Sequence, residues 1–172
     1  MKKILIIALF FTVSTAIFAQ KQKIGFVDTQ VILAQYAPAI KATSDLTALG
    51  KKWKAQLDSM QQDLKNGYAA YQKQAATMKP EQQKQMQQNL IQKEQYMQQF
   101  NQQKFGQQGE LAQKQDELMQ PIRDKIYQAI EKVSKKQNMK FIFDKAGDVL
   151  LLYADPHYDM TYKVLDILKT MK

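Results

Sequence analysis

The chain of 172 residues carries a formal net charge of +9, a single histidine and no cysteine. This composition excludes disulfide bonds, thiolate metal sites and a lipid-modified cysteine. It also offers little material for catalysis, because the six glycines form no phosphate-binding loop and His157 lies alone in the loop-like run ADPHYD. A lone loop histidine is seldom a base or a ligand, so we expect no enzyme, no cofactor and no metal.

Residues 1–19 predict a secretory signal peptide. Lys2 and Lys3 precede an apolar run from Ile4 to Val13, and Ala19 is a suitable cleavage position. The alternative is a membrane anchor, but a spanning helix needs about 20 apolar residues and this run is shorter. After cleavage, 23 basic and 16 acidic residues would leave a net charge of +7. We therefore expect an exported, soluble chain, whose charge favours acidic polypeptides or anionic lipid surfaces and whose compartment argues against nucleic acid.

The segment 20–38 predicts a strand followed by a short helix, as the first part of a β-rich body. Ile24 to Val27 form the apolar strand. Asp28 or Thr29 then caps a helix that ends near Tyr36, because their side-chain oxygens accept the unpaired amide hydrogens of a first helical turn.

Residues 39–120 predict a long helical hairpin. Fifteen glutamines lie between Glu81 and Gln115, a composition compatible with either disorder or a helix. Periodicity favours helices, since disorder gives no reason for apolar residues to recur at steps of three and four. The recurring residues are Leu46, Leu49, Trp53, Leu57, Met60, Leu64, Tyr68, Tyr71, Ala75 and Met78 in the first arm, and Met86, Leu90, Met97, Phe100, Leu111, Leu118, Ile122, Ile126, Ile130 and Val133 in the second.

The tip of the hairpin is expected near residues 78–81, at Lys79-Pro80-Glu81. Proline disfavours helix in the residue before it and fits the first position of a new helix. The two arms must then fold back on each other as an antiparallel coiled coil. At about 1.5 Å per residue, an arm of about 40 residues reaches about 60 Å, so we expect it to project from a body.

Two features interrupt the second arm. Gly106 and Gly109 each cost about 1 kcal/mol of helix stability relative to alanine, so we expect loose pairing from Gln102 to Gly109. Pro121 is expected to bend the helix or to mark the point where it enters the body.

Residues 121–172 are expected to complete the β-rich oligomerisation body, which makes the fold class α+β. Phe141–Asp144 and Val149–Tyr153 predict two strands joined by a turn, and Asp159 or Thr161 caps a last helix. Three short strands with two open edges make a marginal sheet, so several chains should associate, in a number that the residues leave open. The residues expected to build this body are Ile24, Phe26, Phe141, Phe143, Leu150 and Leu152.

Two runs carry a family pattern: Leu118 to Val133, LMQPIRDKIYQAIEKV, and Tyr153 to Leu165, in which YADP precedes Asp159 and Thr161. Together with the signal peptide, KIGFVDTQ and the hairpin, in this order, they resemble the Skp/OmpH family of periplasmic chaperones over essentially the whole chain. The resemblance implies a jellyfish-like homotrimer whose arms hang from a shared β-barrel. It implies binding of unfolded outer-membrane proteins between the arms, without ATP, in the periplasm.

The resemblance also leaves anionic lipid or lipopolysaccharide open as a further partner. No basic cluster here matches a lipopolysaccharide motif, however. The arms are rich in glutamine instead, and residues 41–120 carry eleven basic and eight acidic residues. This near-neutral balance weakens a capture mechanism that depends on charge.

A chaperone that binds many sequences weakly needs adaptable side chains, and methionine is the most adaptable apolar residue. Most methionines and aromatic residues of the arms fit packing of arm on arm. Those near the tip or away from the seam are better candidates for contact with clients: Tyr71, Met78, Met86, Tyr96 and Phe105.

Two other functions remain open from the sequence. A structural coiled-coil scaffold of the cell envelope, with one fixed partner, would favour a better-kept heptad, fewer methionines and no separate β-body. A prefoldin-like chaperone also carries helical arms on a β-body. Prefoldins act in the cytosol, however, and the expected signal peptide argues against that location.

Overall fold

The computed structural model describes residues 22–148 and 150–171, so the expected signal peptide at residues 1–19 lies outside the described residues. Its contacts divide the described chain into two units, residues 22–32 with 127–171 and residues 33–126, and each is described by itself. Within the described ranges, no helix combines the length and the apolar character that crossing a membrane requires.

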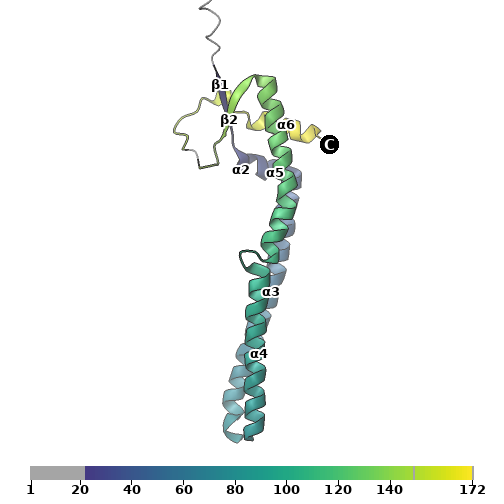
Figure 1. Ribbon diagram of the computed structural model, residues 1–172, viewed down its shortest axis with the longest axis vertical. Helices are drawn as coiled ribbons and strands as arrows, with labels where there is room; N and C mark the ends of the chain where they lie inside the picture. The colour runs from purple at the N-terminus through teal and green to yellow at the C-terminus, as the bar shows by residue number, and fades with distance from the viewer. Residues whose placement is uncertain (1–21, 149, 172) are drawn as a thin grey trace, which may run out of the picture. The chain divides into compact units, whose positions relative to one another are not determined.

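The first unit contains a small parallel sheet. Strand β1 (Lys23–Val27) pairs with β2 (Met139–Asp144), and the register sets Ile24 opposite Phe141 and Phe26 opposite Phe143 (Figure 1). On the other side of β1, the carbonyl of Phe26 accepts a hydrogen bond of 2.8 Å from the amide of Met160. Strand β1 is therefore held on both sides, although the described sheet has two strands.

Paired polar side chains fix the start of helix α2 (Thr29–Gln35). Asp28 Oδ1 accepts from the amide of Val31 at 3.0 Å, which confirms the expected cap. Thr29 turns instead to the end of β2, where its amide and its hydroxyl donate to the two carboxylate oxygens of Asp144 at 3.1 and 2.5 Å. The amide of Asp28 donates to Thr161 Oγ1 at 2.9 Å, so both ends of the sequence of this unit are joined here.

Helix α6 (Thr161–Thr170) contributes Val164, Leu165 and Leu168 to the core of this unit, and it follows the short 3-10 helix η2 (Pro156–Tyr158). The expected cap by Asp159 or Thr161 is wrong, because Met160 takes the N-cap position and makes no side-chain cap bond. Asp159, one residue earlier, accepts from the amide of Thr161 through Oδ1 at 2.8 Å. One face of α6 is apolar and buried, as its periodicity predicts. The buried apolar residues of the unit are Phe26, Val27, Ile32, Ala129, Val133, Met160, Val164, Leu165 and Leu168.

The expected second strand of a β-hairpin is wrong for the single chain. Residues 150–153, the described part of that strand, are irregular, and β2 pairs in parallel with β1 rather than with them. Leu150 and Leu152 are 84% and 88% exposed, so no core of the same chain covers either one. An isolated two-stranded hairpin is marginal in water, which explains why the apolar run alone does not make a strand.

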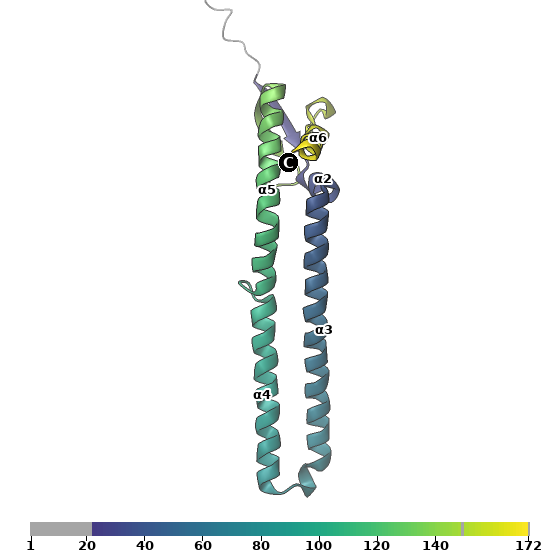
Figure 2. The same cartoon turned by 90° about the vertical axis from the view of Figure 1, so that its right-hand side faces the viewer.

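The second unit is a pair of long helices joined by a tight turn (Figure 2). Helix α3 (Ala37–Gln74) ends in a 3-10 turn, η1 (Ala75–Thr77), and helix α4 (Pro80–Phe105) begins at the proline, as expected. Gln83 closes the turn, since its amide donates to the carbonyls of Ala75 and Met78 at 2.6 and 3.2 Å.

The seam between α3 and α4 packs most closely at Leu90, which is buried together with Leu64 and Trp53. Gly67 faces it, and a Cβ atom at Gly67 would lie 2.7 Å from Leu90 Cδ2. A glycine in the middle of a helix costs stability. The close approach of Leu90 explains why position 67 is nevertheless a glycine. Near it, the hydroxyl of Tyr68 donates to Glu94 at 3.4 Å.

The second arm is broken where two glycines predict weakness. Helix α4 ends at Phe105, and α5 (Glu110–Gln137) starts after the four loop residues 106–109, which bulge away from α3 (Figures 1 and 2). An ion pair between Lys104 and Glu110 spans the break. Helix α5 continues through Pro121, so the proline does not end the helix, and the predicted domain limits at 38/39 and 120/121 stay predictions.

Replacement of Asp144 by alanine should destabilise the first unit. It removes the acceptor of both Thr29 hydrogen bonds and of a third, from the amide of Ala146 at 3.0 Å. We expect a loss of about 2 kcal/mol in the free energy of unfolding, measured by urea denaturation. Thr29→Val, which removes one of these bonds, should cost about half as much. Equal stability of wild type and Asp144→Ala would contradict the role of this carboxylate.

The contact between Gly67 and Leu90 predicts an effect whose sign depends on the background. Gly67→Ala alone should destabilise the hairpin by about 1 kcal/mol, because strain against Leu90 outweighs the gain in helix propensity. In a Leu90→Ala chain, itself weakened by about 2–4 kcal/mol, the same change should stabilise by about 1 kcal/mol. Urea denaturation of the four chains measures the reversal, and additive effects would show that the two residues do not touch.

Candidate functional site

The described chain exposes an apolar surface on one face of the β1–β2 sheet. Side chains alternate between the faces of a strand, so Ile24 and Phe26 share a face with their partners Phe141 and Phe143. Ile24 and Phe141 are 48% and 53% exposed, and Phe143 is also exposed. Phe26 lies on the same face but is buried. Exposed aromatic and branched side chains in one patch mark a surface for interaction.

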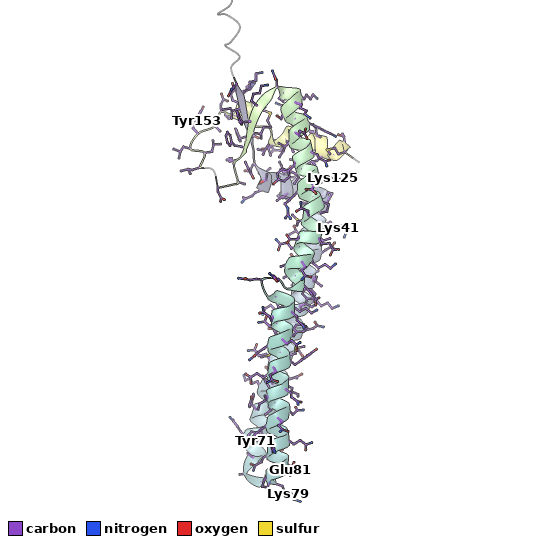
Figure 3. All side chains as sticks on the ribbon, viewed as in Figure 1. Lys41, Tyr71, Lys79, Glu81, Lys125 and Tyr153 are labelled. Atoms are coloured by element: carbon purple, nitrogen blue, oxygen red, sulfur yellow. The ribbon has the colours of Figure 1, made fainter. Side chains whose placement is uncertain are left out.

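The irregular segment 150–153 adds to the exposed apolar residues of the same unit. Leu150, Leu152 and Tyr153 are all more than four-fifths exposed, and Figure 3 labels Tyr153 on this loop. Five of the six residues expected to build an oligomerisation body are thus exposed in the single chain. Tyr153 is exposed as well, and its place at the end of the continuous apolar run Leu150-Leu151-Leu152 was the signal that could have found it.

The predicted client residues fall into two groups in the helical unit. Tyr96 is 60% exposed and lies on α4 away from the seam. Tyr71 lies in the seam, since its hydroxyl accepts a hydrogen bond from the side-chain amide of Gln87 on the other arm (Figure 3). Met78, at the tip, and Met86 are half-buried. Of these four, Tyr96 offers the largest free surface.

Phe105 belongs to a cluster around Trp53. The two rings meet edge to face, with centroids 6.3 Å apart and planes at 89°. Lys104 Nζ lies 4.9 Å from the centre of the Trp53 ring and 5.9 Å from that of Phe100, in the range of cation–π attraction. Trp53 of α3 thus contacts the end of α4 in the stretch where the glycines predict loose pairing of the arms.

Sequence reasoning missed Ile91 and Ile40, which are both 50% exposed. Ile91 directly follows Leu90, and neighbouring residues on a helix point about 100° apart, so both cannot lie in the seam. The adjacent pair was the signal that could have found it.

A groove in the helical unit was also missed. It has a volume of about 380 Å³ and lies between the start of α3 and the middle of α5. Pro121 lines it, and the lysines at its rim, Lys41 and Lys125, are labelled in Figure 3. The apolar part of the lining is Tyr36, Pro38, Ala42, Leu118 and Ile122. The groove can receive an apolar side chain.

His157 and Glu131 have local structural partners. His157 packs edge to face on Tyr158, and its amide donates to Asp155 at 2.9 Å. The Lys135 ammonium donates a hydrogen bond to Glu131 and lowers the pKa of that exposed carboxyl. Within the described ranges, no three His, Cys, Asp or Glu side chains come together as a metal site would need.

Comparison with known proteins was made at the level of family, curated relatives and solved structures. The family model of the OmpH-like outer membrane proteins matches residues 23–168. No curated protein matches the chain. A crystal structure from Caulobacter crescentus CB15, proposed to be an OmpH-like outer membrane chaperone, shares the fold with a TM-score of 0.70 at 17% sequence identity, covering 87% of this chain and 85% of that one. The match extends from the first strand to the last helix, and the chain belongs to the OmpH-like outer membrane protein family.

Proposed function

We propose that the protein is an ATP-independent holdase that binds unfolded outer-membrane proteins along its helical arms and prevents their aggregation. One observation carries the proposal: the arms' methionines are neither in a core nor free in solvent. All five are half-buried, so each presents part of an adaptable apolar side chain along the hairpin. They are Met60, Met78, Met86, Met97 and Met119.

The membership of the family and the shared fold support this proposal. Client contacts are proposed for Tyr71, Met78, Met86, Tyr96 and Phe105, with Tyr96 as the most accessible. Phe105 and Tyr71 already pack within the hairpin, so a client would compete with those contacts or use their outer edges. Such weak and replaceable contacts suit a protein that releases its client without a nucleotide.

A scaffolding coiled coil with one fixed partner is the alternative. A fixed partner favours a well-kept apolar stripe on the outer face, in addition to the seam. On α4 the outer face carries glutamines, and two isolated apolar side chains, Ile91 and Tyr96, are exposed beside them. Scattered apolar residues on a polar face fit transient binding of many sequences better than one permanent helix partner.

Self-association is proposed through the apolar face of the sheet. Ile24, Phe141 and Phe143, with Leu150 and Leu152, would be covered by other copies of the chain. Three copies, as in the family resemblance, would close the open edge of β2. We place this assembly in the periplasm after removal of a signal peptide, and anionic lipid or lipopolysaccharide stays a possible further partner.

The test of the holdase is suppression of aggregation. A urea-unfolded outer-membrane β-barrel protein is diluted into buffer without ATP, with and without the purified protein, and light scattering is followed. We expect suppression at a stoichiometric ratio. In Tyr96→Gln the suppression should weaken several-fold, because an exposed aromatic contact is lost while a good helix former replaces it. Tyr127→Gln, on another exposed tyrosine, is the matched control.

Full aggregation in the presence of the wild-type protein would refute the holdase. Equal loss in both tyrosine variants would remove Tyr96 from the client surface but leave the holdase standing. Circular dichroism of each variant excludes a change in helix content.

Light scattering of the purified protein tests self-association. We expect three times the mass of one chain for wild type and a single chain for Phe141→Lys, because a charge cannot be buried in an apolar interface without a partner. Phe141 is exposed in the single chain, so its replacement should leave the fold intact. Tyr127→Lys should remain associated. A monomeric wild type, or an unchanged mass of Phe141→Lys, would contradict this interface.

A further inference from the structure

We infer that a row of glutamines on the outer face of α4 binds the backbone of an extended, unfolded polypeptide through neutral hydrogen bonds. The inference rests on the proposed holdase and names the chemistry with which its arm recognises a client. The residues of this glutamine row are Gln85, Gln88, Gln92, Gln95, Gln99 and Gln102.

The spacing places the row on one face of the helix. Successive members are three or four residues apart, the repeat that brings residues to one side of an α-helix. All six are exposed, whereas Leu90 in the seam is buried. At about 100° per residue, every member lies at least about 120° from Leu90 around the helix axis. The row therefore faces away from α3.

The glutamine row makes no bonds within its own arm. Among the described residues, the side chains of its six members take part in no hydrogen bond, whereas Gln83 and Gln87 of the same helix bind the turn and Tyr71. Helix α3 covers its surface differently, with ion pairs Lys41–Asp45 and Lys54–Asp58. Helix α4 holds eleven glutamines but only three lysines and two glutamates in 26 residues. Its outer amides are thus free donors and acceptors on a nearly neutral surface.

The chemistry of the row matches an unfolded main chain. A glutamine side chain offers the carbonyl and N–H groups of a peptide unit. An extended polypeptide carries the same groups unpaired, and they are identical for every sequence. Each such bond in water adds little, about 0.5–1.5 kcal/mol, so several in a row give graded and reversible binding. Because the row is uncharged, binding should depend little on salt.

Two exposed apolar residues border the row. Ile91 lies along one side of it and Tyr96 along the other, and they are 50% and 60% exposed. An extended chain laid along the row would place its backbone on the amides and its side chains against these two residues. A helix face that only needs to be solvated could carry lysine as well as glutamine. Solvation also gives no reason for the two exposed apolar residues at its borders.

The test compares two triple variants of the full chain. Gln88→Ala/Gln92→Ala/Gln95→Ala removes the centre of the row, and Gln56→Ala/Gln61→Ala/Gln72→Ala removes three exposed glutamines of α3. Alanine is the best helix former, so both variants should fold. The probes are a urea-unfolded outer-membrane β-barrel protein and a fluorescent neutral peptide of serine, threonine and valine. A third probe is the same peptide with alternate backbone amides N-methylated.

We expect the row variant to bind both unmethylated probes about tenfold more weakly and the α3 variant to bind within about twofold of wild type. The methylated peptide should bind wild type about tenfold more weakly than its parent. Raising salt from about 0.05 to about 0.5 M should change wild-type affinity less than about twofold.

Equal affinities of the two variants, indifference to methylation, or loss of binding in salt would overturn the glutamine row while the holdase stands. If wild type binds none of the probes, the proposed function itself fails. If the row variant alone loses self-association in light scattering, the row is an interface between copies of the chain, and the inference is likewise wrong.

Discussion

In a pair of helices, each helix can bury only one of its faces against the other, and this limit governs the whole helical unit. Along α3 and α4, the seam buries Trp53, Leu64 and Leu90 and leaves most other side chains in water. Stability must therefore come from a few close contacts, such as Leu90 against Gly67. The remainder of each helix is free to carry other chemistry. Methionines at the edge of the seam and glutamines opposite it are two uses of that freedom.

The first unit meets a different constraint, because two strands and a short helix enclose a small core. Its ends are joined by polar bonds, from Asp28 to Thr161 and from Thr29 to Asp144, rather than by a large apolar interior. The apolar residues that this core does not cover lie on one face of the sheet, at Ile24, Phe141 and Phe143, and in the irregular segment 150–153. In the single chain, this unit therefore has a small apolar core and also a large apolar surface that remains exposed.

The sequence predicts the parts of this structure that local physics decides. Periodicity places both arms, Pro80 places the tip, and Asp28 caps its helix as expected. It fails where distant segments decide the outcome. Residues 150–153 have the composition of a strand but no strand partner in the described chain, and β2 pairs in parallel with the distant β1 instead. For the site, exposure of Tyr96 followed from spacing, whereas the engagement of Phe105 with Trp53 depends on how α3 lies against the break.

The loop at residues 106–109 has a consequence for the length of the arm. Helix α3 runs without interruption past this level, while the second arm is made of two pieces, each aligned with α3 by its own contacts. An added or deleted residue inside a continuous coiled coil rotates every later side chain out of the seam. In this loop the same change would only alter the size of the bulge. The break is thus the point at which related chains can gain or lose residues, or accept an attached label, while α4 and α5 keep their registers.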